Sequence, residues 1–385
     1  MIPYGRQLIS ENDITSVIDV LKSDFITQGP QVPEFEQRVA SYVGASHAIA
    51  VNSATSALHI ACLALNLEKG DWLWTSPNSF VASANCALYC GANIDFVDID
   101  PATYNMCPEK LADKLEKAKR AKKLPKIIIL VHFAGQSCDM EAFSALSKRF
   151  GFKIIEDASH AIGGRWDDGY IGSCQFSDIT VFSFHPVKII TTAEGGMLTT
   201  NSKLVADKLI ALRSHGVTRS QSLLSKNEEG AWYYEQQSLG YNYRLTDIQA
   251  ALGISQMNEI DNFILRRHEI ASRYDEQLKN LPLILPVQHE KSYSSYHLYP
   301  IQIRETASGV DRRQLFDELR SSGILVNVHY IPIHTQPYYS NIGFKLGDFP
   351  NSEKYYERTL SIPIHAGLSE AEQGLIIENM QRLLL

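Results

Sequence analysis

The sequence has no long apolar run and no excess of positive charge. Hydrophobic residues make up 44% of its 385 residues, yet the longest apolar runs, such as Ile127 to Val131, are far too short to span a bilayer. The first residues lack the basic segment and apolar stretch of a secretory signal. Lys plus Arg number 36 against 43 Asp plus Glu, so the net charge of -7 provides no field that would attract nucleic acid. We expect a soluble cytoplasmic protein that binds neither membranes nor nucleic acid.

Metal and dinucleotide motifs are also missing. The six cysteines form no C-x-x-C pair, and the twelve histidines include no H-E-x-x-H, so the sequence predicts no zinc ribbon, no thioredoxin site and no metal centre. No expected strand is followed by G-x-G-x-x-G, which argues against an NAD-dependent dehydrogenase. We therefore predict that the cysteines are small buried side chains.

Short β-rich runs alternate with helical patterns through the first half of the chain. This alternation predicts an α/β fold, in which a mostly parallel seven-stranded sheet carries helices on both faces. The expected strands are His47 to Val51, Trp72 to Ser76, Asn93 to Val97, Lys126 to His132, Phe152 to Glu156, Ile179 to Phe184, and Gly196 to Thr200.

The pattern changes after Tyr243. A long helical stretch is expected from Asp247 to about Leu278, followed by strands near Tyr296 to Ile303 and Leu325 to Tyr330. A last helix is expected from Glu370 to Leu384. We predict a large domain at residues 1–250 and a smaller C-terminal α+β domain at residues 251–385.

A single lysine, Lys188, follows an apolar strand in the segment from Val181 to Met197. Ser183 precedes it, and the pair Gly195-Gly196 leads into the next strand. Partial burial lowers the pKa of a lysine, because desolvation disfavours the ammonium form, and a neutral lysine can form a Schiff base. The alternative is an ordinary surface lysine.

Three further segments carry polar or flat side chains that complement such a lysine. Asp157 ends an apolar strand, where open α/β sheets bind ligands, although it could simply cap a helix. Small hydroxyl residues from Asn52 to Leu58 form a strand-to-helix turn that suits a phosphate or a plain N-cap. Phe80 could stack on a flat ring or fill the core. Together they match the requirements of pyridoxal phosphate, which needs an amine, an anion for its ring nitrogen, a phosphate cradle and a ring contact.

Several motifs resemble the DegT/DnrJ/EryC1 sugar aminotransferases, within the fold-type I pyridoxal phosphate enzymes. The resemblance covers nearly the whole chain and implies an aminotransferase that works as a homodimer with active sites shared between subunits. The motifs are Pro3-Tyr4-Gly5, Gln28-Gly29-Pro30, the Asn52 turn, Pro77 to Ala82, Glu156-Asp157-Ala158, the Lys188 segment, Gly240 to Ala250, and Val328 to His334.

The resemblance also implies roles for individual residues. Lys188 would join the cofactor covalently, Asp157 would pair with its pyridinium nitrogen, and Phe80 would stack on its ring. Asn242 would reach the cofactor phosphate of the partner subunit. The residues expected near the phosphate of their own subunit's cofactor are Ser53, Ala54, Thr55 and Ser183. The residues expected to bind the nucleotide sugar are Tyr4, Arg244, His329 and Tyr330.

Two histidines depart from the common family pattern. His160 stands where many members have Gln, and it keeps a hydrogen-bonding group near the cofactor ring. The family includes sugar dehydratases in which histidine replaces the reactive lysine, so His185 competes with Lys188. Lys188 aligns with the reactive position, and the resemblance therefore implies amino transfer.

Within the family, the runs Val131 to Asp139 and Ser183 to Gly196 are most similar to the aminotransferases of pseudaminic acid synthesis. This similarity implies transfer from L-glutamate to C4 of a UDP-4-keto-6-deoxy-N-acetylhexosamine, which gives UDP-4-amino-4,6-dideoxy-N-acetyl-β-L-altrosamine. The alternatives are another UDP-4-keto-6-deoxy sugar, such as the precursor of bacillosamine, and, less favoured, a sugar dehydratase.

Overall fold

The large part of the molecule is built on one seven-stranded sheet, whose strands are ordered β2-β10-β9-β6-β5-β3-β4. The computed structural model describes residues 1–226, 230–304 and 309–385. Strand β10 is antiparallel to both of its neighbours, while the remaining strands run in one direction. The strands are β2 (His47–Val51), β3 (Trp72–Thr75), β4 (Asn93–Phe96), β5 (Ile127–Val131), β6 (Lys153–Asp157), β9 (Ile179–Ser183) and β10 (Gly196–Thr200). The seven strands predicted from the sequence are confirmed.

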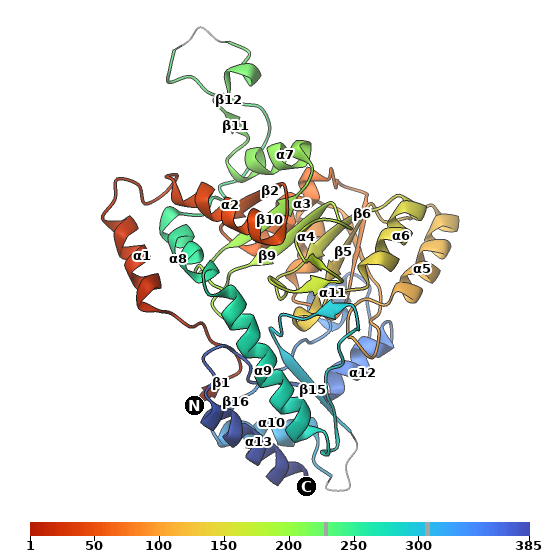
Figure 1. Cartoon of the computed structure of the whole chain (residues 1–385). Helices are drawn as coiled ribbons and strands as arrows, with labels where there is room; N and C mark the ends of the chain where they lie inside the picture. Colours follow the sequence, from red (N-terminus) through yellow and green to blue (C-terminus); the bar gives the residue numbers. More distant parts are fainter. Residues whose placement is uncertain (227–229, 305–308) are drawn as a thin grey trace.

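Helices cover both faces of this sheet (Figure 1). In β5, Ile127 and Ile129 pack on the side of α3 and α4, whereas Ile128 and Leu130 pack on the side of α5 and α6. Successive strand residues point to opposite faces, and both faces are buried, which explains the continuous apolar runs. The helices of this part are α2 (Gln31–Val43), α3 (Ala54–Ala64), α4 (Ala82–Tyr89), α5 (Pro108–Ala121), α6 (Met140–Phe150), α7 (Lys203–Arg213) and α8 (Asp247–Met257).

The C-terminal part has its own apolar core around a three-stranded antiparallel sheet, ordered β13-β15-β17. Strand β1 (Ile2–Pro3) pairs in parallel with β16 (Ile324–Leu325), and Ile2 is buried in this same core. The first residues of the chain therefore pack with its last third, while the domain boundary after residue 250 stays a prediction. The other elements are α9 (Ile260–Leu278), β13 (Leu283–Ile284), β15 (Tyr299–Ile303), α10 (Arg312–Ser321), α11 (Pro337–Asn341), α12 (Pro350–Arg358), β17 (Thr359–Ile362) and α13 (Glu370–Leu384).

Two predicted elements in this region are wrong in extent. The expected helix from Asp247 to Leu278 is divided at Asn258 and Glu259. Helix α8 packs against α1 and α2, whereas α9 runs into the C-terminal core (Figure 1). The strand expected from Leu325 to Tyr330 ends at Leu325, because the chain then turns toward a cavity at the sheet. The last helix is confirmed as α13.

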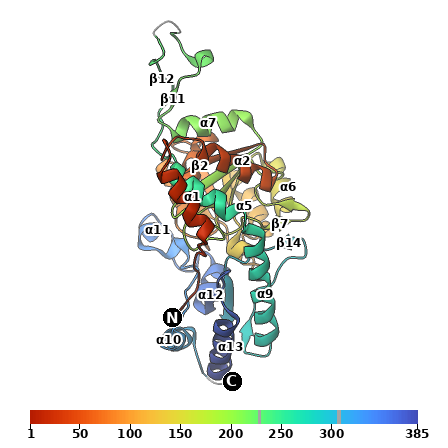
Figure 2. The same ribbon diagram turned by 60° about the vertical axis from the view of Figure 1, so that its left-hand side comes forward.

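Two peripheral segments expose apolar side chains. Helix α1 (Glu11–Leu21) leaves Ile14, Ile18 and Leu21 largely exposed. The hairpin of β11 (Val217–Thr218) and β12 (Glu235–Gln236) projects away from the body of the molecule in both views (Figures 1 and 2). Trp232, between these two strands, is 74% exposed. A smaller sheet joins β7 (Arg165–Trp166), β8 (Gly169–Tyr170) and β14 (Ser292–Tyr293).

Candidate active site

A cavity of about 590 Å³ opens where several strands of the large sheet end. Strands β2, β6 and β9 all lead toward it with their carboxyl ends, which is where open α/β sheets bind ligands. The segment after β16 closes it from the C-terminal part. Its polar and aromatic lining includes Tyr4, Ser53, Thr55, Ser79, Phe80, Asp157, Ser159, His160, Ser183, His185, Lys188, Glu194, Asn327, His329 and Tyr330.

The N-terminus of α3 forms one end of the cavity. Ser53 is the N-cap, and its Oγ accepts a hydrogen bond of 3.1 Å from the backbone N–H of Ser56. Strand β10 passes close behind this turn: a Cβ on Gly196 would lie 2.6 Å from the carbonyl carbon of Ser53 and 2.7 Å from the nitrogen of Ala54. Ser183 is the register partner of Gly196. Hydroxyl groups thus gather around a helix N-terminus, which is a favourable place for a phosphate.

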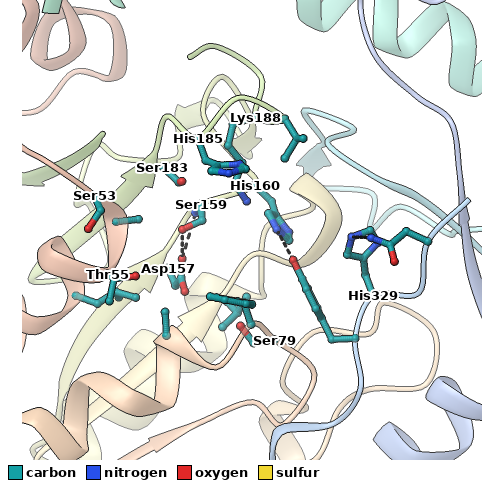
Figure 3. A pocket seen from close by; sticks show the side chains of 18 of the residues that line it. Ser53, Thr55, Ser79, Asp157, Ser159, His160, Ser183, His185, Lys188 and His329 are labelled. Carbon is teal, nitrogen blue, oxygen red and sulfur yellow. Dashed lines mark hydrogen bonds between the residues drawn. The ribbon is translucent and has the colours of Figure 1, made fainter. Parts of the chain in front are cut away.

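Asp157 ends β6 and is buried, with its carboxylate held by two serines, of which Figure 3 shows Ser159. The hydroxyl of Ser83 donates to Oδ2 at 2.6 Å. The hydroxyl of Ser159 donates to Oδ1 at 2.6 Å, and the Ser159 N–H donates to the same atom at 3.2 Å. Neither serine was predicted as a site residue from the sequence. A carboxylate fixed in this way is oriented as an acceptor for a protonated ring nitrogen.

Lys188 lies half-buried in the loop after β9 (Figure 3). Burial lowers the pKa of its amine to about 8, and the negative charge of Asp157 opposes part of this effect. At pH 7 roughly a tenth of such a lysine is neutral, compared with less than a thousandth of a lysine with the ordinary pKa. Lys188 thus lines the cavity with a partly buried side chain, unlike a fully exposed surface lysine. His185 is exposed at the edge of the same cavity.

Phe80 places an apolar ring in the cavity and leaves it 60% exposed. The ring is not part of the protein core, so the alternative that Phe80 merely fills the core is wrong. An uncovered aromatic face beside Asp157 and Thr55 suits stacking on a flat ligand.

The segment after β16 contributes His329 and Tyr330. The Nδ1 atom of His329 is 2.9 Å from Oγ of Ser361, and its ring centroid is 5.2 Å from that of Tyr4. Burial, helped by the charge of Lys188, lowers the pKa of His329 to about 3, so this ring is neutral at physiological pH.

The predicted residues Asn242 and Arg244 are not among the residues that line the cavity of this chain. Asn242 is exposed, and Arg244 donates to Oγ of Ser214 at 3.2 Å. The lining residues that the sequence interpretation missed include Ser79, Ser159, Glu194 and Asn327.

In the part of the chain that the structure describes, no group of three or more His, Cys, Asp or Glu side chains is arranged to hold a metal ion. None of the helices described there has the length and apolar character needed to cross a bilayer.

Comparison with known proteins gives matches over the whole chain. The model of the DegT/DnrJ/EryC1/StrS aminotransferase family matches residues 7–381. The spore coat polysaccharide biosynthesis protein SpsC of Bacillus subtilis is 40% identical over 381 residues, which cover 98% of this chain and 95% of that protein. A UDP-4-amino-4,6-dideoxy-N-acetyl-beta-L-altrosamine transaminase of Campylobacter jejuni is 35% identical over 387 residues, which cover 100% of this chain and 98% of that protein. The structure of Helicobacter pylori PseC, an aminotransferase involved in the biosynthesis of pseudoaminic acid, has a TM-score of 0.89 at 32% identity, covering 100% of this chain and 99% of that chain.

The chain belongs to the DegT/DnrJ/EryC1/StrS aminotransferase family. It is an aminotransferase, and the predicted α/β fold with a mostly parallel central sheet is confirmed. Pyridoxal 5′-phosphate is the cofactor of this family.

Proposed function

We propose that this enzyme transfers the amino group of L-glutamate to C4 of a UDP-4-keto-6-deoxy-N-acetylhexosamine, which gives UDP-4-amino-4,6-dideoxy-N-acetyl-β-L-altrosamine. The observation that carries the amino transfer is the half-buried Lys188, which shares one cavity with Asp157 and the helix N-terminus at Ser53. The choice of sugar is supported by the similarity to the Campylobacter jejuni transaminase.

The cavity fits the family's cofactor in the chemistry of its side chains. The α3 N-terminus, with Ser53, Ala54 and Thr55, and Ser183 at the end of β9 offer N–H and O–H donors to a phosphate. Asp157 offers a carboxylate to a pyridinium nitrogen, Phe80 offers a ring face, and Lys188 offers an amine to an aldehyde. His160 stands beside them as a further polar group. Ser83 and Ser159 hold the Asp157 carboxylate, and the Ser56 N–H holds the Ser53 hydroxyl, so these two parts of the site are preorganised.

Lys188 performs the proton transfers in this proposal. When bound, the cofactor accepts the electron pair of the bond broken at the amino-bearing carbon. The neutral Nζ takes a proton from Cα of glutamate as a general base, and the resulting ammonium returns a proton as a general acid. With the keto sugar, the same nitrogen delivers a proton to C4 from one face. The face of C4 presented to Nζ therefore sets the configuration of the product.

Tyr4, His329 and Tyr330 bind the sugar nucleotide in this proposal, because they line the same cavity and His329 lies on the side away from Ser53 and Thr55 (Figure 3). Asn242 and Arg244 lie outside this chain's own cavity, so we assign them to the active site of a partner subunit in a homodimer. The exposed apolar side chains of α1 and of the projecting hairpin support such an assembly, because large exposed apolar side chains are common at subunit interfaces.

Two alternatives differ in substrate or in reaction. Another UDP-4-keto-6-deoxy sugar, such as the bacillosamine precursor, would use the same catalytic groups. A dehydratase would use His185 in place of a lysine, but the lowered pKa of Lys188 favours amino transfer, because a general base must be neutral before it can take a proton.

Incubation of the purified holoenzyme with each of the two epimeric UDP-4-keto-6-deoxy-N-acetylhexosamines and L-glutamate tests the proposal. We expect 2-oxoglutarate and the β-L-altro 4-amino product, identified by NMR. Turnover of only the D-configured ketosugar would contradict the assigned substrate. Consumption of a sugar without formation of 2-oxoglutarate would contradict transfer from glutamate.

A further inference from the structure

His160 has a polar partner on each of its two ring nitrogens. It follows β6 and is 5% exposed. The backbone N–H of Ala134 donates to Nδ1 at 3.3 Å, and Nε2 is 3.0 Å from the hydroxyl oxygen of Tyr330. The ring also packs against His297, with centroids 4.4 Å apart. These contacts hold the imidazole in one orientation.

The contact with Ala134 determines which nitrogen carries the proton. A backbone N–H can only donate, so Nδ1 must offer its lone pair. Burial lowers the pKa of His160 well below the ordinary value, and the positive charge of Lys188 lowers it further, so the ring has a single proton. That proton is on Nε2. The hydrogen bond therefore runs from the Nε2–H of His160 to the hydroxyl oxygen of Tyr330.

The direction of this bond leaves the hydroxyl hydrogen of Tyr330 unused. Among the described residues this hydroxyl makes no other hydrogen bond, and Tyr330 lines the same cavity as Lys188. Burial raises the pKa of Tyr330, so the phenol keeps its proton. The ring is fixed by an edge contact with Phe133, at 6.2 Å between centroids. A hydroxyl that accepts one hydrogen bond becomes a stronger donor for another.

We propose that His160 is a positioning residue, which fixes the Tyr330 hydroxyl as a hydrogen-bond donor to the carbonyl oxygen of the keto substrate. The inference rests on the proposed function, because it needs a keto compound in the cavity. A donor at this oxygen stabilises the negative charge that develops there when an amine attacks the carbonyl carbon. His160 itself does not touch the reacting atoms and acts through Tyr330.

Substitution of His160 by glutamine and by methionine distinguishes the hydrogen bond to Tyr330 from simple packing of the side chain. An amide can accept from Ala134 through its oxygen and donate to Tyr330 through its nitrogen, as the imidazole does. Methionine has a similar length but cannot donate, so it leaves the Tyr330 hydroxyl without a fixed direction. The matched variants are His160→Gln, His160→Met, Tyr330→Phe, and His160→Met combined with Tyr330→Phe.

The rate assay uses 2-oxoglutarate as the keto probe and holoenzyme converted to its amine form with pyridoxamine 5′-phosphate. Single-turnover absorbance gives the rate. We expect His160→Gln to stay within about threefold of wild type and Tyr330→Phe to fall about 100- to 1,000-fold, as expected for the loss of one charge-stabilising donor. His160→Met should be comparably slow, and adding it to Tyr330→Phe should change nothing further. Equal slowing by Gln and Met, or a further loss in the double variant, would contradict the inference.

A second readout does not depend on activity. In holoenzyme labelled with ¹⁵N-histidine, NMR should show His160 as the neutral tautomer protonated on Nε2, with the signal assigned by its absence in His160→Gln. Tyr330→Phe should shift the Nε2 signal. An Nδ1-protonated ring would overturn the inference while leaving the amino transfer intact. A wild-type enzyme that does not react with 2-oxoglutarate at all would instead contradict the proposed function, and with it this role of His160.

Discussion

The carboxylate of Asp157 raises the pKa of Lys188, but burial of the lysine outweighs it and brings the pKa down to about 8. Asp157 ends β6, and Lys188 lies in the loop after β9, the strand that pairs in parallel with β6. The carboxylate limits the loss of basicity that burial imposes. Lys188 therefore stays basic enough to take a proton and neutral enough to attack an aldehyde.

This balance predicts the pH dependence of cofactor binding. Only the neutral amine attacks an aldehyde, so the rate at which apoenzyme binds pyridoxal 5′-phosphate covalently should rise about tenfold per pH unit below the pKa. The sign follows from the lowered pKa: the rate increases with pH and levels off above about pH 8. Stopped-flow absorbance measures it. A rate that still rises steeply toward pH 10 would mean that the lysine is not desolvated.

Asp157→Asn should lower turnover by at least about 100-fold, because the amide removes the negative charge opposite a protonated ring nitrogen but keeps the shape of the side chain. Steady-state kinetics with saturating cofactor measures the loss, and thermal unfolding checks that the fold remains. Asp207→Asn is the matched control, since Asp207 lies exposed on α7 in a pair with Lys203. If Asp157→Asn retained the rate of this control, Asp157 would have no role at the ring.

Gly196→Ala should weaken cofactor binding more than it weakens the fold. The added Cβ would meet the backbone of Ser53 and Ala54 within 2.7 Å and push the α3 N-terminus away from the cavity. Overpacking of this kind costs about 1–3 kcal/mol. Equilibrium titration with the cofactor and thermal unfolding measure the two effects.

Gly374→Ala is the control for this experiment. Gly374 lies inside α13, and the nearest atom to an added Cβ is a terminal nitrogen of Arg273 at 3.6 Å. Alanine in the helix should stabilise the protein by about 0.4–1 kcal/mol and leave cofactor binding unchanged. Equal cofactor affinity in both variants would show that the α3 N-terminus does not hold the phosphate.

Much of the fold follows from local sequence. The strands were predictable because their apolar residues are buried on both faces of the sheet, which produces uninterrupted runs such as Ile127 to Val131. The break between α8 and α9 could not be predicted from the sequence, because Asn258 and Glu259 carry no strong helix-breaking signal. The chain turns there to let α9 reach the C-terminal core, and that requirement belongs to tertiary packing.

The candidate site was predictable where residues sit at strand ends and less so elsewhere. Asp157 ends one apolar strand, Lys188 follows another, and the topology brings the two residues together. Ser83 lies inside a helix and reaches Asp157 only in three dimensions. The contact of Ser159 could have been predicted, because an aspartate carboxylate often accepts a hydrogen bond from the backbone N–H two residues further along the chain. No sequence pattern places the hydroxyl of Tyr330 against His160.

Reduction of the holoenzyme with borohydride, followed by peptide mass mapping, tests the central assignment most directly. We predict a pyridoxyl group on Lys188 alone in the wild-type enzyme. Lys188→Ala should retain its fold and have no transaminase activity. Lys203→Ala is the control, because Lys203 is exposed on α7, and its labelling and activity should be unchanged. A label on another residue, no label at all, or a Lys188→Ala enzyme that transaminates at the parental rate would contradict the account.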